Sequence, residues 1–169
     1  QAVEELYRHG HRRIAALISR PNDQSISQLR YEGYVQALES HGIPVDPELV
    51  ISTGGFGAKD AYRAVQEKMA ENVDFTALFA IADSMAIGAM RALMDAGRRI
   101  PEDCSVIAID GLELSAYIEP PLTTLCQPME EMGRRSAEIL LDMVRHKGSH
   151  ACELLPTTLR QGRSVAAPG

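Results

Sequence analysis

The chain is 169 residues long, and its 17 Lys and Arg against 23 Asp and Glu give a formal net charge of −6. Hydrophobic residues make up 45% and charged residues 24%, which is typical of a globular domain and excludes a disordered or fibrous chain. No run of about 18 apolar residues is present, which excludes a membrane span, and the acidic balance argues against this stretch alone gripping a nucleic-acid backbone.

Three widely spaced cysteines, Cys104, Cys126 and Cys152, form no CxxC pair. This pattern predicts neither a disulfide framework nor a zinc site, and it favours a reducing, cytoplasmic compartment. The chain opens at Gln1 with no initiator Met and no signal-peptide pattern. We therefore expect it to begin inside a longer protein, in which a DNA-binding or secretory segment could lie upstream.

Short apolar runs alternate with longer amphipathic stretches along most of the chain. Helices are expected at 1–9, 27–41, 58–71, 83–96 and 129–147, the first four ending at or near Gly10, Gly42, Glu71 and Gly97. Strands are expected at 13–18, 49–52, 76–81, 105–109 and 154–159, with a short extended piece at 122–126. The tail from Ala166 is expected to fray, and Gly148 to end the last helix.

The expected strands are almost continuously apolar rather than alternating. Such runs are typical of parallel strands buried on both faces by helices. The alternation of strand and helix therefore predicts a doubly wound α/β fold with a mostly parallel sheet.

Ligands of such sheets collect at the carboxyl ends of the strands, here residues 20–27, 54–57, 82–83 and 110–111. Asp83 and Asp110 could do acid–base work, bind Mg²⁺ or accept hydrogen bonds from hydroxyls. For Asp83 a helix N-cap is the favoured interpretation, whereas for Asp110 a ligand role and a turn role both stay open.

Arg30 and Phe56 are two further candidate site residues near these strand ends. Arg30 lies in the first turn of its helix, where a cation opposes the helix dipole, so either a ligand-facing donor or an ordinary surface Arg is indicated. Gly54-Gly55-Phe56-Gly57 matches neither a dinucleotide fingerprint nor a P-loop, and a tight turn with positive φ is favoured. The aromatic ring of Phe56 could stack on a sugar or base.

No motif compels an enzyme, and no metal ion or cofactor is expected. His9 and His11 have no third metal ligand at usable spacing, and the same holds for His146 and His150. These histidines are better explained as charges that complement the dipole at the end of a helix. A phosphoacceptor receiver domain would need an acidic cluster after its first strand and a late Lys; Asp23 fits poorly, and no Lys closely follows Ile109.

Five stretches of the sequence, taken together, resemble one protein family. They are HGHRRIA at 9–15, RYEGY at 30–34, ALFA at 77–80 with DSMAIGA at 83–89, IPEDCSV at 100–106, and PPLTT at 120–124 with QP at 127–128 and MGRR at 132–135. Together they resemble the ligand-sensing domain of the lactose/galactose (LacI/GalR) repressor family of bacterial transcription regulators.

The resemblance implies a periplasmic-binding-protein type fold, in which two α/β lobes enclose an effector and an upstream helix-turn-helix domain binds DNA. Residues 1–121 and 152–163 resemble the second lobe. Residues 122–151 resemble hinge segments and a helix that belongs to the first lobe, and 164–169 form a tail. That helix, which carries a Met-rich stripe, is expected to pack on another chain or to be poorly ordered.

The resemblance also implies site residues. Arg30, Asp110 and Phe56 stand where the family binds its effector, a sugar or related metabolite, and Ser27, Ala82 and Asp83 are placed in the same site. The family usually has Asn at position 82 and a second Asp at 111, where this chain has Ala82 and Gly111. These departures point to an effector that is smaller, less hydroxylated or differently posed.

The resemblance further implies a homodimer formed through the helix at 83–97 and the loop at 112–118. The candidate interface residues are apolar, with burial inside one chain as the alternative for about half of them; they are Ile87, Met90, Met94, Leu112, Leu114 and Ile118. A lobe of a secreted, periplasmic sugar-binding protein is the main alternative function, and an α/β enzyme is the third.

Overall fold

The computed structural model describes residues 1–19, 26–146 and 152–169, and it contains one mixed six-stranded sheet. The strands run in the order β2-β1-β3-β4-β5-β6, and all neighbours are parallel except the antiparallel pair β5 and β6. The predicted doubly wound α/β fold is therefore confirmed. The strands are β1 (Ile14–Ser19), β2 (Val50–Thr53), β3 (Ala77–Ala80), β4 (Ser105–Asp110), β5 (Thr123–Cys126) and β6 (Thr158–Arg160).

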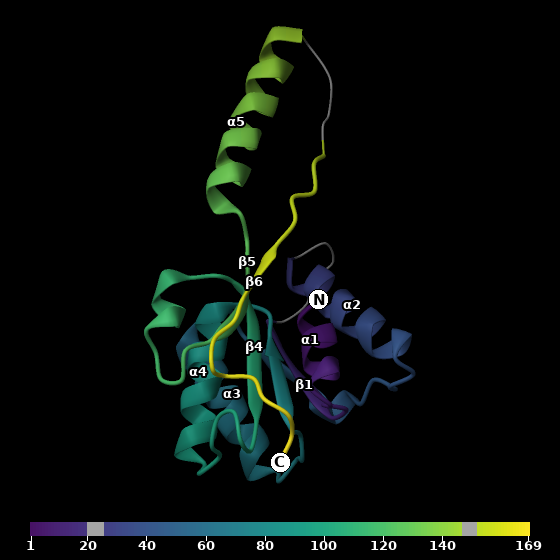
Figure 1. The fold of residues 1–169 in the computed structure, drawn as a ribbon, viewed down its shortest axis with the longest axis vertical. Helices are drawn as coiled ribbons and strands as arrows, with labels where there is room; N and C mark the ends of the chain where they lie inside the picture. Colours follow the sequence, from purple (N-terminus) through teal and green to yellow (C-terminus); the bar gives the residue numbers. More distant parts are fainter. Residues whose placement is uncertain (20–25, 147–151) are drawn as a thin grey trace.

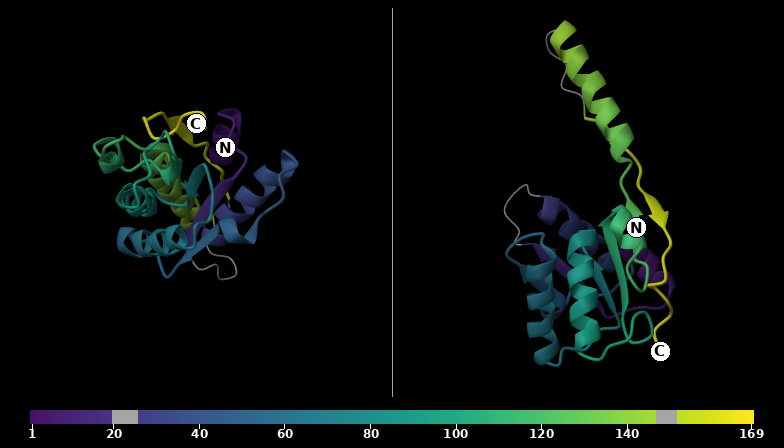
Figure 2. Two further views of the ribbon diagram at one scale, coloured as in Figure 1. Left: turned by 90° about the horizontal axis from the view of Figure 1, so that it is seen from below. Right: turned by 90° about the vertical axis from the view of Figure 1, so that its left-hand side faces the viewer.

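Helices cover both faces of this sheet, with α1 and α2 on one side and α3 and α4 on the other (Figures 1 and 2). Short 3₁₀ turns, η1 (Pro47–Leu49) and η2 (Glu113–Ala116), lie in two of the connections. The α-helices are α1 (Ala2–Arg8), α2 (Ile26–Ser40), α3 (Ala58–Ala70), α4 (Asp83–Asp95) and α5 (Met129–His146). The ends predicted at Gly10, Gly42 and Gly97 are confirmed, since all three glycines adopt positive φ beyond their helices.

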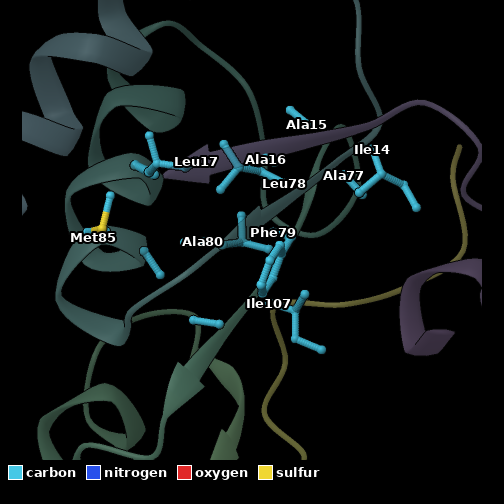
Figure 3. Close-up of a cluster of buried hydrophobic side chains, with 14 of the residues drawn as sticks. Ile14, Ala15, Ala16, Leu17, Ala77, Leu78, Phe79, Ala80, Met85 and Ile107 are labelled. Carbon is cyan, nitrogen blue, oxygen red and sulfur yellow. The ribbon is translucent and has the colours of Figure 1, made fainter. Parts of the chain in front are cut away.

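The core lies between the two helical layers and the central strands. Every residue of β1 and β3 is buried, and their side chains meet Met85 of α4 and Ile107 of β4 (Figure 3). Both strands mix small alanines with larger Leu, Ile or Phe side chains, which lets the helices approach the sheet closely. The continuous apolar runs of the sequence thus correspond to strands covered on both faces.

The last helix, α5, stands away from this body on the two segments that leave β5 and return to β6 (Figures 1 and 2). Five of its large apolar side chains are exposed; they are Met129, Met132, Leu140, Leu141 and Val144. The predicted strand at 154–159 is shorter than expected, because pairing with β5 extends only over Thr158–Arg160. The predicted stop at Gly148 lies outside the described residues.

The expectation of a frayed tail is wrong. Ser164 is fully buried, its hydroxyl donates to the Val106 carbonyl at 2.6 Å, and its own carbonyl accepts from the Val106 amide at 2.7 Å. The Ala166 carbonyl accepts a hydrogen bond from His11 Nε2 at 2.8 Å, and its amide donates to Ser105 Oγ. The tail is thus fixed along β4 by contacts that are distant in sequence.

Candidate functional site

Arg30 and Asp110 meet at the carboxyl ends of the strands. Arg30, in the first turns of α2, donates from Nη2 to Asp110 Oδ1 at 3.1 Å and from Nη1 to the carbonyl of Ile81. The Arg30 side chain is 14% exposed and that of Asp110 is 26% exposed, so the ion pair remains open to solvent on one side. The arrangement offers guanidinium donors and a carboxylate acceptor to one polar ligand.

Gln127 completes this group and was missed by the sequence reasoning. Its Nε2 donates to Asp110 Oδ1 at 2.8 Å, and its backbone amide donates to the Asp110 carbonyl at 3.2 Å. Oδ1 of Asp110 therefore receives two donors, and among the described residues none is directed at Oδ2. Gln127 directly follows β5, so the strand-end rule applied to that strand would have found it.

The backbone at this point departs from ordinary strand geometry. Asp110 has φ of 138° and Gly111 has φ of 78°, a region that L side chains rarely adopt. A Cβ on Gly111 would lie 2.5 Å from Sγ of Cys126 and 2.7 Å from its Cα. A side chain at position 111 would therefore require Cys126 or the backbone of the loop to shift.

Phe56 lies in the loop between β2 and α3 and is 40% exposed. Ser84 Oγ, at the start of α4, donates to the Phe56 carbonyl at 2.7 Å, and Thr53 Oγ1 donates to the Gly55 carbonyl at 2.5 Å. The predicted positive φ in this Gly-rich turn is wrong, since Gly54, Gly55 and Gly57 all avoid it. Side-chain hydrogen bonds shape the turn instead.

Three of the predicted effector residues are buried: Ser27, Ala82 and Asp83. The Ser27 hydroxyl donates to the Ser19 carbonyl at 2.7 Å and thereby fixes the start of α2 to the end of β1. Ala82 is 3% exposed and forms the N-cap of α4 through its backbone. The other strand-end positions predicted in this region, 20–25, lie outside the described residues.

Asp83 neither caps α4 nor is available to bind an effector in this conformation. It is the first residue of α4, and the N-cap is Ala82, so the capping interpretation is wrong. The Asp83 carboxylate is fully buried and accepts hydrogen bonds from the Leu112 amide at 2.7 Å, Ser115 Oγ at 2.8 Å and Thr124 Oγ1 at 2.5 Å. With three internal donors and no exposed surface, it holds the β4–β5 loop (residues 111–122) against α4 and offers no contact to a ligand in this conformation.

The candidate interface residues divide by exposure. Met94, Leu112 and Leu114 are exposed, and Ile87 and Ile118 are half-buried. Met90 of α4 is buried in the core, so its assignment to a surface is wrong. Tyr117, 78% exposed in the same loop, was missed. We call the exposed loop residues Leu112, Leu114 and Tyr117 the apolar patch.

Comparison with known proteins assigns the chain to a family. Residues 3–165 match the model of the periplasmic binding protein-like domain, and the chain belongs to that family. The HTH-type transcriptional repressor CytR of Escherichia coli is 39% identical over 160 residues, which cover 91% of this chain and 46% of the repressor. CelR of Thermobifida fusca, another HTH-type regulator, is 36% identical over 94% of this chain and 46% of its own length.

Solved structures agree with this assignment. A complex of the regulator CelR with cellobiose superimposes with a TM-score of 0.89 at 34% identity, over 98% of this chain and 50% of that one. The Lac repressor dimer bound to operator and an anti-inducer gives a TM-score of 0.90 at 30% identity, over 98% and 56%. The chain thus matches the effector-binding domain of LacI-family regulators and spans about half the length of these relatives.

These relatives overturn the periplasmic alternative, because they are transcriptional regulators rather than secreted sugar-binding proteins. They are also not enzymes. Over the ranges that the structure describes, no helix has the length and apolarity required to cross a membrane.

Proposed function

We propose that this chain is the second lobe, with part of the hinge, of the effector-sensing domain of a DNA-binding transcription regulator. The observation that carries the proposal is the Arg30–Asp110–Gln127 group at the carboxyl ends of the strands, in a chain of the LacI type. A sugar or related metabolite binds against this group, and closure of a first lobe over it changes the affinity for operator DNA through an upstream helix-turn-helix domain. Such a regulator works in the cytoplasm.

The donor set fits a polar, hydroxylated effector. Oδ2 of Asp110 can accept from a hydroxyl, and Arg30 can donate to a hydroxyl or ring oxygen. The exposed ring of Phe56 supplies an apolar face of the kind that stacks on a sugar ring. The buried Ala82 brings no amide donor, so the effector makes fewer polar contacts on that side.

The division into lobes accounts for the exposed apolar face of α5. Residues 1–121 and 152–163 form the second lobe, while 122–151 contain hinge segments and a helix whose apolar face packs on the first lobe. Five large apolar side chains on one helix would otherwise remain in water, at a cost of roughly 25 cal/mol for each Å² of apolar surface.

Substitution of the two charged groups tests this proposal. In the full-length protein, a panel of mono- and disaccharides that includes cellobiose and ribose is first screened for a rise in Tm, and the sugar selected is titrated by calorimetry. Arg30→Ala and Asp110→Ala each remove one partner of a half-buried pair, so binding should weaken by about 2–5 kcal/mol.

Arg91→Ala is the matched control, because Arg91 pairs with Asp95 on the exposed side of α4. It should leave the affinity unchanged. Equal affinities for the wild type and both site variants would refute the assignment of Arg30 and Asp110. A panel in which no sugar raises Tm would refute the sugar class.

A further inference from the structure

The β4–β5 loop connects the candidate effector site to the apolar patch. It begins at Gly111, directly after Asp110, and carries Leu112, Leu114 and Tyr117 within the next six positions. The loop contains only one short 3₁₀ turn, so side chains from other elements must fix its course. Asp83 supplies one such anchor through the Leu112 amide and Ser115 Oγ.

A second anchor comes from Arg160 of β6. Its Nη2 donates to the Leu112 carbonyl at 3.0 Å and to Ser115 Oγ, and its Nη1 lies 3.5 Å from the Gly111 carbonyl. One guanidinium therefore reaches three oxygens of the loop. The Ser115 hydroxyl accepts from Arg160 and donates to Asp83, so it links the buried carboxylate to the strand at the far edge of the sheet.

The two strands that lead to and from α5 both take part in this network. Thr124 of β5 and Arg160 of β6 are cross-strand partners, and such partners project from the same face of a sheet. Thr124 Oγ1 bonds to Asp83, while Arg160 bonds to Ser115 and the loop backbone. A shift of this strand pair relative to β4 therefore changes the hydrogen bonds of the loop and of α4 together.

We propose that Arg160 is a positioning residue that couples the strand pair β5–β6 to the apolar patch. The inference rests on the proposed function, in which the hinge segments include β5, the partner of β6, and on the dimer surface that the resemblance places in the loop at 112–118. When the hinge moves as the lobes close, Arg160 carries that movement to Leu112 and Ser115, and so to the neighbouring Leu114 and Tyr117. The contacts of Asp83, Ser115, Leu112 and Arg160 form the connected set that would carry this coupling.

The test measures the loop itself in the full-length protein. In Arg160→Met, which keeps the aliphatic stem but removes every donor, the amides of Leu112, Ser115 and Tyr117 should exchange with deuterium about tenfold faster. The dimer dissociation constant, measured by sedimentation velocity, should rise by a similar factor. Arg160→Lys, which retains a single ammonium, should give an intermediate value for both.

Arg8→Met is the matched control, since Arg8 pairs with Glu4 within α1 rather than with any residue of the β4–β5 loop. It should leave loop exchange and dimerisation at the wild-type level. Wild-type loop exchange in Arg160→Met, or a dimer constant equal to that of Arg8→Met, would overturn the inference. The sugar titrations with Arg30 and Asp110 variants are independent of these measurements, so the coupling can fail while the proposed function stands.

Discussion

His11 shows how a single side chain fixes two distant segments. Its imidazole is 1% exposed, its Nδ1 is 2.9 Å from Thr76 Oγ1, and its Nε2 donates to the Ala166 carbonyl. The neutral tautomer with the proton on Nε2 satisfies both contacts, since Nδ1 can then accept from the Thr76 hydroxyl. Burial lowers the pKa of His11 below its ordinary value of 6.5, with nearby positive charge from His9 and Arg12 acting in the same direction.

Stability should therefore decrease in mild acid. Because the pKa of His11 is lower in the folded state than the 6.5 of the unfolded chain, the unfolded chain binds more protons as the pH falls below 6.5. The contribution of His11 is complete above that pH and is lost as the pH falls towards the folded-state pKa. Urea midpoints measured between about pH 8 and pH 5 should fall less steeply in His11→Gln, which keeps a donor to Ala166 but does not titrate. Identical slopes for both proteins would contradict this account.

For single residues, the sequence predicts well which side chains lie at strand ends, but it predicts poorly which distant residues they form hydrogen bonds with. Arg30 and Asp110 were singled out because each lies next to a strand end, and they are hydrogen-bonded to each other. Asp83 also lies at a strand end, yet its carboxylate is directed inward. Its donors, Ser115 and Thr124, are 32 and 41 residues away in sequence, and no local pattern signals them.

Helices α3 and α4 approach each other closely because Gly88 of α4 has no side chain. Gly88 lies on the buried face of α4, and a Cβ built on it would be 2.0 Å from the carbonyl oxygen of Ala58 at the start of α3. Backbone rather than a flexible side chain occupies that space, so the helices would have to separate. The same pair of helices positions Phe56 through the bond from Ser84.

Gly88→Ala should destabilise the fold by about 1–3 kcal/mol, because the added methyl group forces a backbone shift between two packed helices. Gly33→Ala is the matched control, since Gly33 is also inside a helix but has no atom within 4 Å of the added Cβ. It should stabilise the protein by about 0.5–1 kcal/mol through helix propensity. Urea denaturation of both variants decides the question, and equal changes in midpoint would show that the close approach of α3 and α4 has no energetic consequence.

Elements with strong local patterns were predicted almost to the residue, whereas those that depend on partners were not. The apolar runs and the helix ends at Gly10, Gly42 and Gly97 identify β1, β3, α2 and α4, since burial on both faces and positive φ leave clear local signals. The tail beyond Gly162 has no such signal. Its order comes from Ser164 and Ala166, whose partners on β4 and at His11 are far away in sequence.

For the whole molecule, two exposed apolar surfaces lie on different parts of the chain. Helix α5 projects beyond the sheet, whereas α4 and the β4–β5 loop belong to the body (Figure 1). The exposed apolar side chains of α5 are therefore on a different part of the chain from those of the apolar patch. In the proposed function the first is covered by the first lobe, and we expect the second to be covered by the partner of the homodimer that the resemblance implies. The two surfaces can therefore be tested separately.

Leu114→Lys should convert the full-length protein from a dimer to a monomer, because it places a charge at the centre of an apolar interface where no acidic partner is expected. Leu114 is 63% exposed, so the substitution should leave the fold of the single chain intact. Leu29→Lys is the matched control, since Leu29 is 59% exposed but lies on α2, on the opposite side of the sheet. Sedimentation velocity at micromolar protein should show a monomer for Leu114→Lys and a dimer for Leu29→Lys. If both variants sediment as dimers with the wild-type dissociation constant, the apolar patch is not the dimer surface, and the covering of Leu114 and Tyr117 must come from another segment of the full-length protein.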